Sequence, residues 1–147
     1  MAKRDAGRGS RPPYVTYATW ARVLEDTSER KPTRMDSTYY RELGLSDSTG
    51  VTVKAALSFL GLVDGDTIPT ERLVELAAAA GDDRRRLIRQ VVEESYEPIV
   101  GGIDLEHATM GHLLAAFAEA GAKGNVGQKC VTFFLAMAKD AGMGLSP

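Results

Sequence analysis

The sequence predicts a mainly α-helical protein, a compact bundle of about seven helices in two pseudo-repeated halves. Three observations support this class. Apolar residues recur at spacings of three and four in several segments, as they do on one face of a helix. Capping residues such as Asp36, Thr70 and Thr109 precede these segments, and glycines such as Gly44 and Gly121 follow them. The hydrophobic content of 44% is sufficient for a core without disulfides or metals.

Four of the helices are expected before Gly81. The first covers residues 17–27, where Trp20, Val23 and Leu24 share one face. Each of the next three begins at a side chain that can cap a helix and stops near a glycine. In chain order, the cap, the apolar residues and the end are Asp36 or Ser37 with Tyr39, Tyr40, Leu43 and Gly44; Ser48 or Thr49 with Val53, Ala56, Leu57, Leu60 and Gly61; and Thr70 with Leu73, Val74, Leu76, Ala77 and Gly81.

Residues 62–68, between the third and fourth helices, predict one short β-hairpin. Asp64-Gly65-Asp66 favours a tight turn between Leu62-Val63 and Thr67-Ile68, and Pro69 keeps the second strand brief. Helix, glycine-containing turn, helix and short ribbon is the element order of a winged helix-turn-helix. The first half is therefore expected to be winged-helix-like, with its third helix in the position that reads DNA.

Three helices are expected after Gly81. The first covers residues 83–97, starts at Asp82 and Asp83 and ends before Pro98. The last covers residues 125–141, and its broad apolar face predicts a place in the core. The caps and apolar residues are Leu87, Ile88, Val91, Val92 and Tyr96 in the first; Thr109, Leu113, Leu114, Phe117 and the final Gly121 in the second; and Val126, Cys130, Phe133, Phe134 and Met137 in the last.

Two segments of the chain resemble each other. Residues 54–60 and 129–135 both contain a Lys, a Phe five positions later and a Leu six positions later, and each follows a helix that ends in glycine. An ancestral duplication explains this pattern, and chance is the alternative, because apolar helices readily share such spacings.

We expect a flexible basic arm over residues 1–13 and a single helical domain over 14–147, with halves 14–81 and 82–147.

A set of short segments keeps its order and spacing along nearly all of the chain after residue 13. These segments are Pro13-Tyr14-Val15 with Tyr17, Ala56-Leu57 with Phe59-Leu60-Gly61-Leu62-Val63, Pro69-Thr70 with Leu73, Lys129 with Phe134-Leu135, and Ala138-Lys139-Asp140-Ala141-Gly142 with Leu145-Ser146. Together they resemble the bacterial, archaeal and phage domain-of-unknown-function family numbered 5343. The resemblance implies a shared fold and a bacterial or phage source, and it supplies no activity.

Charge is unevenly distributed along the chain. Residues 1–34 contain eight Lys/Arg and four Asp/Glu, whereas residues 35–147 contain ten and sixteen. Cations that gather in the arm, on the third helix and at the start of the fifth are candidate contacts for a partner or for nucleic acid: Lys3, Arg4, Arg8, Arg11, Lys54, Arg84, Arg85, Arg86 and Arg89. The alternative for the four at the fifth helix is a solvated face with ion pairs to nearby carboxylates such as Asp82, Asp83, Glu93 or Glu94.

No catalytic, cofactor or metal site is predicted, and the protein is not expected to be an enzyme. His107 and His112 are five positions apart, which places them on different faces of a helix, and Cys130 alone completes no ligand set. Apolar neighbours predict a buried, inert Cys130 thiol. One cysteine, together with the lack of a secretory or membrane-spanning pattern, predicts a cytoplasmic protein without membrane association.

Two functions stay open. The first is a non-enzymatic protein-interaction or self-associating module, with another protein or a second copy in a homodimer as its partner. The second is a winged-helix-like DNA-binding regulator that uses the basic arm and the arginine cluster. We favour the first, because residues 35–70 carry only two Lys/Arg against five Asp/Glu, which is unsuited to phosphate contact. Its candidate anchors are aromatic residues near the amino terminus: Tyr14, Tyr17, Trp20, Tyr39 and Tyr40.

Overall fold

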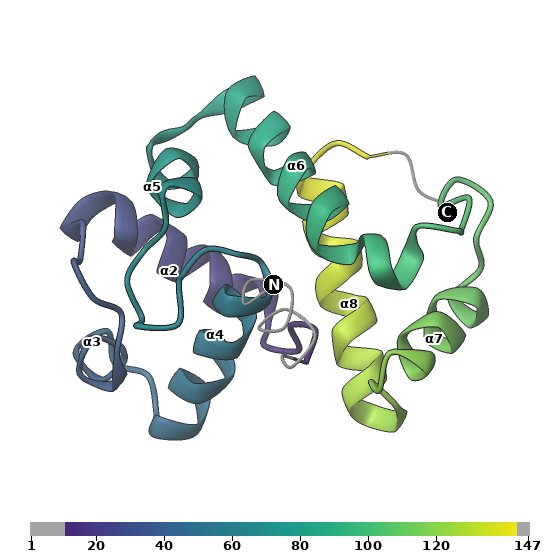
Figure 1. The fold of residues 1–147 in the computed structure, drawn as a ribbon, viewed down its shortest axis with the longest axis horizontal. Helices are drawn as coiled ribbons and strands as arrows, with labels where there is room; N and C mark the ends of the chain where they lie inside the picture. Colours follow the sequence, from purple (N-terminus) through teal and green to yellow (C-terminus); the bar gives the residue numbers. More distant parts are fainter. Residues whose placement is uncertain (1–10, 144–147) are drawn as a thin grey trace.

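Seven α-helices make up the regular structure of the computed structural model, which describes residues 11–143. Figure 1 shows these helices in two lobes. The first lobe contains α2 (Tyr17–Arg30), α3 (Ser37–Glu42), α4 (Asp47–Phe59) and α5 (Glu71–Ala78), and the second contains α6 (Gly81–Val100), α7 (Met110–Glu119) and α8 (Gly124–Asp140). The prediction of a mainly helical chain is confirmed.

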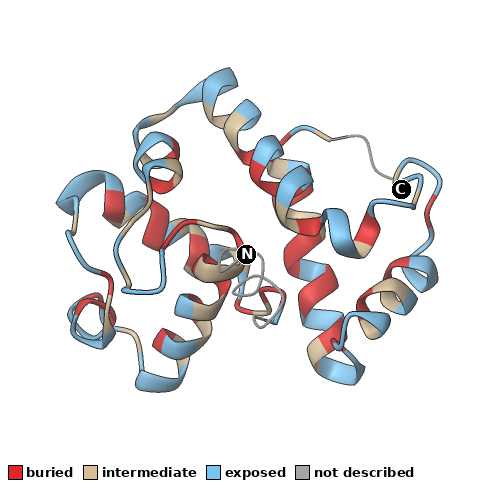
Figure 2. Cartoon of the chain, in the orientation of Figure 1, coloured by how far each residue is buried: buried red, intermediate tan, exposed pale blue. Residues whose placement is uncertain are grey.

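The hydrophobic core extends through both lobes, and α8 contributes more of it than its length alone would suggest. Buried apolar side chains from the two lobes form one contiguous cluster. Figure 2 shows buried residues along most of α8, as its broad apolar face predicts. The largest fully buried side chains include Trp20, Tyr96, Phe117, Phe133 and Phe134. Buried aromatic residues therefore contribute to the core of both lobes.

Two consecutive side chains of α8 pack against different lobes. The Phe133 ring lies edge-on to Trp20 of α2, with 6.1 Å between ring centroids. The Phe134 ring packs against Tyr96 of α6 at 4.8 Å and against Phe117 of α7 at 5.7 Å. Aromatic pairs at such distances contribute roughly 0.5–1.5 kcal/mol each beyond the area that they bury. Thus α8 contacts the first lobe through Phe133 and packs within the second lobe through Phe134.

Local side-chain chemistry sets most helix starts. Thr70 and Thr109 cap α5 and α7 as predicted. Their hydroxyls accept hydrogen bonds from the N–H groups of Leu73 and His112, respectively. By contrast, α4 begins earlier than its pattern predicts, because the Ser46 hydroxyl accepts from the N–H of Thr49 at 3.2 Å. The predicted caps Ser48 and Thr49 therefore lie inside the first turn of α4.

The helix predicted over residues 83–97 is longer in the structure, and α6 continues past Pro98 to Val100. A proline inside a helix removes one backbone hydrogen bond and costs about 3 kcal/mol in the middle of a helix. Here Pro98 lies in the last turn, and the extra residues bury Val100 and pack Ile99 against the core. Burial of a valine side chain contributes about 1.5–3 kcal/mol. Packing thus offsets the local cost of the proline.

The β-hairpin predicted over residues 62–68 is not formed. The loop folds back through one isolated antiparallel bridge between Val63 and Pro69, and residues 11–143 contain no β-strand. Pro69 has no N–H to donate to a ladder. The Asp64 carboxylate instead accepts from the N–H groups of Asp66 and Ile68 at 2.8 and 3.0 Å. Accordingly, α3 and α4 form a helix-turn-helix without the ribbon that would complete a winged helix.

The α3–α4 and α7–α8 turns have the same backbone geometry. Gly44 and Gly121 adopt the left-handed conformation, with φ of 89° and 97°. After each glycine, an N–H donates to a carbonyl in the preceding helix, Leu45 to Tyr40 at 3.0 Å and Ala122 to Phe117 at 2.9 Å. In this register Lys54 corresponds to Val131, and not to Lys129 as the sequence comparison predicts. The turns match, but the repeat predicted from residues 54–60 and 129–135 is not confirmed.

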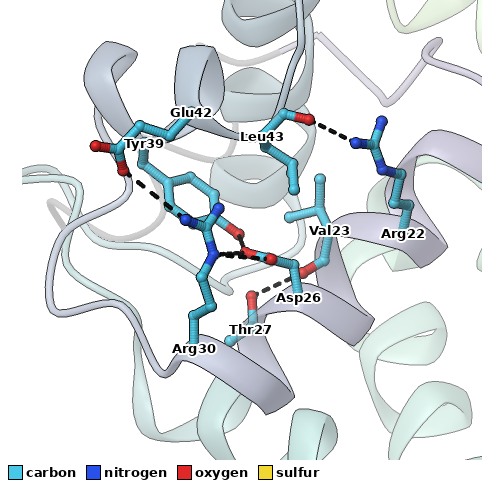
Figure 3. A network of polar contacts seen from close by, with 8 residues as sticks. All are labelled: Arg22, Val23, Asp26, Thr27, Arg30, Tyr39, Glu42 and Leu43. Atoms are coloured by element: carbon cyan, nitrogen blue, oxygen red, sulfur yellow. Dashed lines mark hydrogen bonds and ion pairs between the residues drawn. The ribbon is translucent and has the colours of Figure 1, made fainter.

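A polar network fixes α3 against α2, as Figure 3 shows. The Tyr39 hydroxyl donates to Asp26 Oδ2 at 2.6 Å, and Arg30 Nε donates to Asp26 Oδ1 at 2.9 Å. Burial alone would raise the pKa of Asp26, but these two hydrogen bonds outweigh it and hold that pKa below its usual value. Arg22 Nη2 donates to the Leu43 carbonyl oxygen at the end of α3, at 2.5 Å. These hydrogen bonds therefore tie the short α3 to α2.

Gly127→Ala should destabilise the protein. A methyl group at this position would lie 2.6 Å from the Ala122 carbonyl oxygen, so the backbone would have to move. We expect a loss of about 1–3 kcal/mol, despite a gain of roughly 1 kcal/mol in helix propensity. Urea denaturation measures the difference. Gly111→Ala is the control, because its methyl group would come no closer than 3.7 Å to Thr109 Oγ1. Equal midpoints for Gly127→Ala and the parent chain would contradict the prediction.

Candidate functional site

A groove lies between the two lobes, where the amino-terminal halves of α2, α4 and α8 meet. Its volume is about 610 Å³, which is within the range of ligand-binding sites. Because α2 and α4 belong to the first lobe and α8 to the second, the groove forms only when the lobes pack. We call it the inter-lobe groove, and it is lined by Tyr14, Val15, Thr16, Tyr17, Thr19, Ser48, Thr49, Thr52, Asn125, Gln128, Lys129, Thr132 and Phe133.

Hydroxyl and amide side chains dominate the lining of the inter-lobe groove, and none of its residues is acidic. Thr132 Oγ1 donates to the Gln128 carbonyl oxygen at 2.9 Å, which leaves the hydroxyl oxygen free to accept. The side chains of Asn125, Gln128 and Lys129 are exposed. The groove therefore offers hydrogen-bond donors, acceptors and one positive charge, that of Lys129.

The segment before α2 contributes the apolar part of the lining. Pro12 and Pro13 are buried, and Cys130 Sγ donates to the Pro12 carbonyl oxygen at 3.3 Å. The flexible arm predicted over residues 1–13 is therefore wrong for these two residues, because both prolines pack against the protein. Tyr14 and Val15 follow directly and line the groove. Residues 1–10, which include Lys3, Arg4 and Arg8, lie outside the described residues.

A hydrogen bond joins the lobes beside the groove, and an ion pair within the second lobe holds its acceptor. Tyr17 at the start of α2 donates its hydroxyl to Asp140 Oδ2 at 2.5 Å, and Arg84 Nη1 donates to Asp140 Oδ1 at 2.8 Å. Burial alone would raise the pKa of Asp140, but the hydrogen bonds from Arg84 and Tyr17 hold that pKa below its usual value. Burial and the Asp140 charge raise the pKa of Tyr17, so its hydroxyl stays protonated.

The arginines predicted as contacts at the start of α6 are paired with carboxylates of the chain itself. Arg85, Arg86 and Arg89 bind Asp82, Asp83 and Glu93, at 2.9, 2.9 and 3.3 Å, so these three form the solvated face that is the alternative for this cluster. Arg84 instead belongs to the bridge with Asp140. Of the other predicted contacts, Arg11 lies 5.5 Å from the Tyr14 ring centroid, and Lys54 is exposed on α4 outside the groove lining.

The structure divides the predicted aromatic anchors into two groups. Trp20, Tyr39 and Tyr40 are buried in the core, where a partner cannot reach them. Tyr14 and Tyr17 are half-buried and line the inter-lobe groove. Sequence reasoning missed the polar residues of α8 that line the groove, Asn125, Gln128, Lys129 and Thr132. Their spacing along the predicted last helix, opposite its apolar face, is the signal that would have found them.

The described residues contain no group of His, Cys, Asp and Glu side chains that could hold a metal ion. His107 Nδ1 lies 2.7 Å from Asp104 Oδ2, and His112 Nδ1 accepts from the N–H of Thr109 at the start of α7. Both imidazoles thus have local structural partners. Cys130 is buried as predicted, and burial raises the pKa of its thiol to about 11. A thiol with such a pKa is a poor nucleophile at neutral pH.

Comparison with known proteins gives no family and no structural relative. No protein-family model, curated protein or solved structure matches the chain. Among residues 11–143, no helix has the length and apolar character that crossing a membrane requires. Function must therefore be inferred from the groove and from the charges around it.

Asp140→Asn should lower the free energy of unfolding by about 1–2 kcal/mol at pH 7. Arg84 would lose its counter-charge, and both groups are about 30% exposed, which limits the effect. The folded-state pKa of Asp140 lies below its ordinary value of 3.8. Its contribution is therefore complete above that value and is lost as the pH falls through the folded-state pKa.

Urea denaturation of the parent chain and Asp140→Asn, at pH 7 and in steps to about pH 3, measures this contribution. The difference between the two proteins should shrink as the pH falls, since the parent carboxylate becomes neutral as well. Asp83→Asn is the control, because its ion pair with Arg86 is exposed. A stability difference that does not depend on pH would contradict the assigned role of Asp140.

Proposed function

We propose that the protein is a non-enzymatic protein-interaction module and that the inter-lobe groove is its binding surface. The observation that carries this proposal is the composition of the lining. Hydroxyl and amide side chains surround aromatic ones, with one lysine and no carboxylate. The partner is another protein or a second copy of the chain.

This composition suits a polypeptide partner. Asn125 and Gln128 each offer an N–H donor and a C=O acceptor, the same two groups that a peptide unit presents. Tyr14 and Tyr17 add rigid surface that is both apolar and polar, and the threonine hydroxyls adapt their hydrogen bonds to the partner. Antibody paratopes bind proteins with a similar combination of tyrosines and small polar side chains. Such a surface gains affinity through shape and hydrogen bonds more than through net charge.

DNA is the competing partner, and the charges of the chain count against it. Proteins that bind duplex DNA commonly neutralise about 6–10 phosphates with lysine and arginine. The groove lining contains one cation, and the four arginines at the start of α6 already pair with carboxylates. A DNA-binding regulator would therefore have to rely on other cations, such as Arg11 and Lys54. Tight binding to duplex DNA would overturn the proposal.

Three further predictions accompany this proposal: membership of family 5343, an ancestral duplication of the halves 14–81 and 82–147, and a cytoplasmic location. The matching glycine turns of the two lobes favour the duplication. The single, buried Cys130 suits a reducing compartment.

Selection from a displayed library of random short peptides, with the full chain as bait, tests the proposal. Selected peptides should bind the parent chain and lose at least ten-fold in affinity for Thr132→Trp, because the indole would occupy the groove. Thr132 is exposed, so the substitution leaves the core intact. Gln90→Trp is the matched control, since Gln90 is an exposed polar residue of α6 outside the groove. Its affinity for the same peptides should equal that of the parent chain.

The same samples should be titrated with random-sequence duplex DNA across a salt series and sized by light scattering. A dimer that Thr132→Trp abolishes would identify a second copy of the chain as the partner and support the proposal. Selection of no peptide, or equal binding by Thr132→Trp and Gln90→Trp, would overturn it. Tight DNA binding that weakens steeply with salt would replace it with the DNA-binding function.

A further inference from the structure

We infer that the inter-lobe groove accepts an extended peptide segment whose carboxylate pairs with Lys129. This inference rests on the proposed function, because it names the class of peptide that the groove would select. Two observations support the inference: Lys129 lies among neutral hydrogen-bonding side chains, and no acidic residue lines the groove.

Lys129 differs in its surroundings from the arginines at the start of α6. The four arginines at the start of α6 each have a carboxylate partner within the described residues, whereas the ion pairs of residues 11–143 do not include Lys129. Its neighbours on the same face of α8 are Asn125, Gln128 and Thr132, which are all neutral. An acidic group that enters the groove would therefore meet a cation that has no internal counter-charge.

The polar stripe of α8 has a length that suits an extended peptide. From Asn125 to Thr132 the helix rises about 10 Å, at 1.5 Å per residue. An extended chain covers this distance with roughly three residues, at about 3.3 Å each. Asn125 and Gln128 can bond the peptide N–H and C=O groups, while Lys129 lies within the same stripe for the carboxylate.

The apolar lining explains why the peptide needs more than charge. Tyr14, Val15 and Phe133 line the same groove, and Tyr17 packs at 5.4 Å from the Phe133 ring. An apolar side chain beside the acidic one would bury its surface against Tyr14 and Tyr17, the two half-buried aromatic residues of the lining, and non-directional burial supplies most of the affinity in such contacts. The preferred segment therefore combines one Asp, Glu or terminal carboxylate with a neighbouring apolar residue.

A carboxylate fits this groove better than a phosphate does. A phosphorylated side chain carries about −1.5 to −2 charges at pH 7, and phosphate sites commonly use an arginine cluster. The groove supplies a single lysine and no arginine. One lysine balances the single charge of a carboxylate, so an unmodified acidic segment is the complementary ligand.

Peptides taken from the selection above, with the acidic residue kept as Asp or replaced by Asn or Lys, provide the probes. The Asp peptide should bind the parent chain about two- to five-fold more tightly than the Asn peptide, as expected for an exposed ion pair. Lys129→Gln should abolish that preference, and Lys129→Glu should reverse it in favour of the Lys peptide. Lys54→Gln is the matched control, because Lys54 is an exposed lysine outside the groove, and it should keep the preference.

The outcomes separate this inference from the proposed function. If peptides bind in the groove but Asp, Asn and Lys versions bind equally, or if Lys129→Glu does not reverse the order, the carboxylate inference fails and the protein-interaction function stands. If no peptide binds and Thr132→Trp changes nothing, the proposed function itself fails. A preference lost equally in Lys129→Gln and Lys54→Gln would show a general charge effect and would also overturn the inference.

Discussion

The contact of α8 with α2 of the first lobe holds the two lobes of the fold together. Phe133 and Phe134 are adjacent in the chain, yet their rings contact aromatic residues of different lobes. Because protein interiors are packed at the density of organic crystals, a change in either ring would be felt on both sides of the helix. The hydrogen bond from Tyr17 to Asp140 joins the first lobe to the carboxyl end of the same helix, and Arg84 of the second lobe holds that carboxylate. The two lobes therefore meet along α8.

The inter-lobe groove is a consequence of this packing. The apolar face of α8 is buried in the core. The polar residues on the other side of α8, Asn125, Gln128, Lys129 and Thr132, line the groove together with residues from the starts of α2 and α4. Those starts carry threonine and serine, which helix N-termini favour for capping reasons alone. A surface rich in hydrogen-bonding groups thus arises where three helices begin. Its composition is what distinguishes it from the charged outer faces of α6.

Ion pairs within the chain reduce the positive charge that the arginine-rich start of α6 offers to a partner. In the sequence, Arg84, Arg85, Arg86 and Arg89 form a basic cluster that could attract phosphate. In the structure each guanidinium lies within 4.0 Å of a carboxylate, so the local field is close to neutral. Exposed pairs of this kind add little stability, and they also leave little charge for a partner. This pairing favours the protein-interaction function over DNA binding.

The helical class, most helix limits and the burial of the last helix follow from local sequence patterns, because caps, glycine stops and apolar spacing act over a few residues. These patterns did not determine the course of α6 through Pro98, the exposure of Val74 at 57% or the loss of the hairpin. Those depend on what each segment packs against. The inter-lobe groove also depends on tertiary packing, because Thr16, Thr52 and Lys129 come together only after the lobes pack. Local rules place residues on helix faces, and only tertiary contacts decide which faces meet.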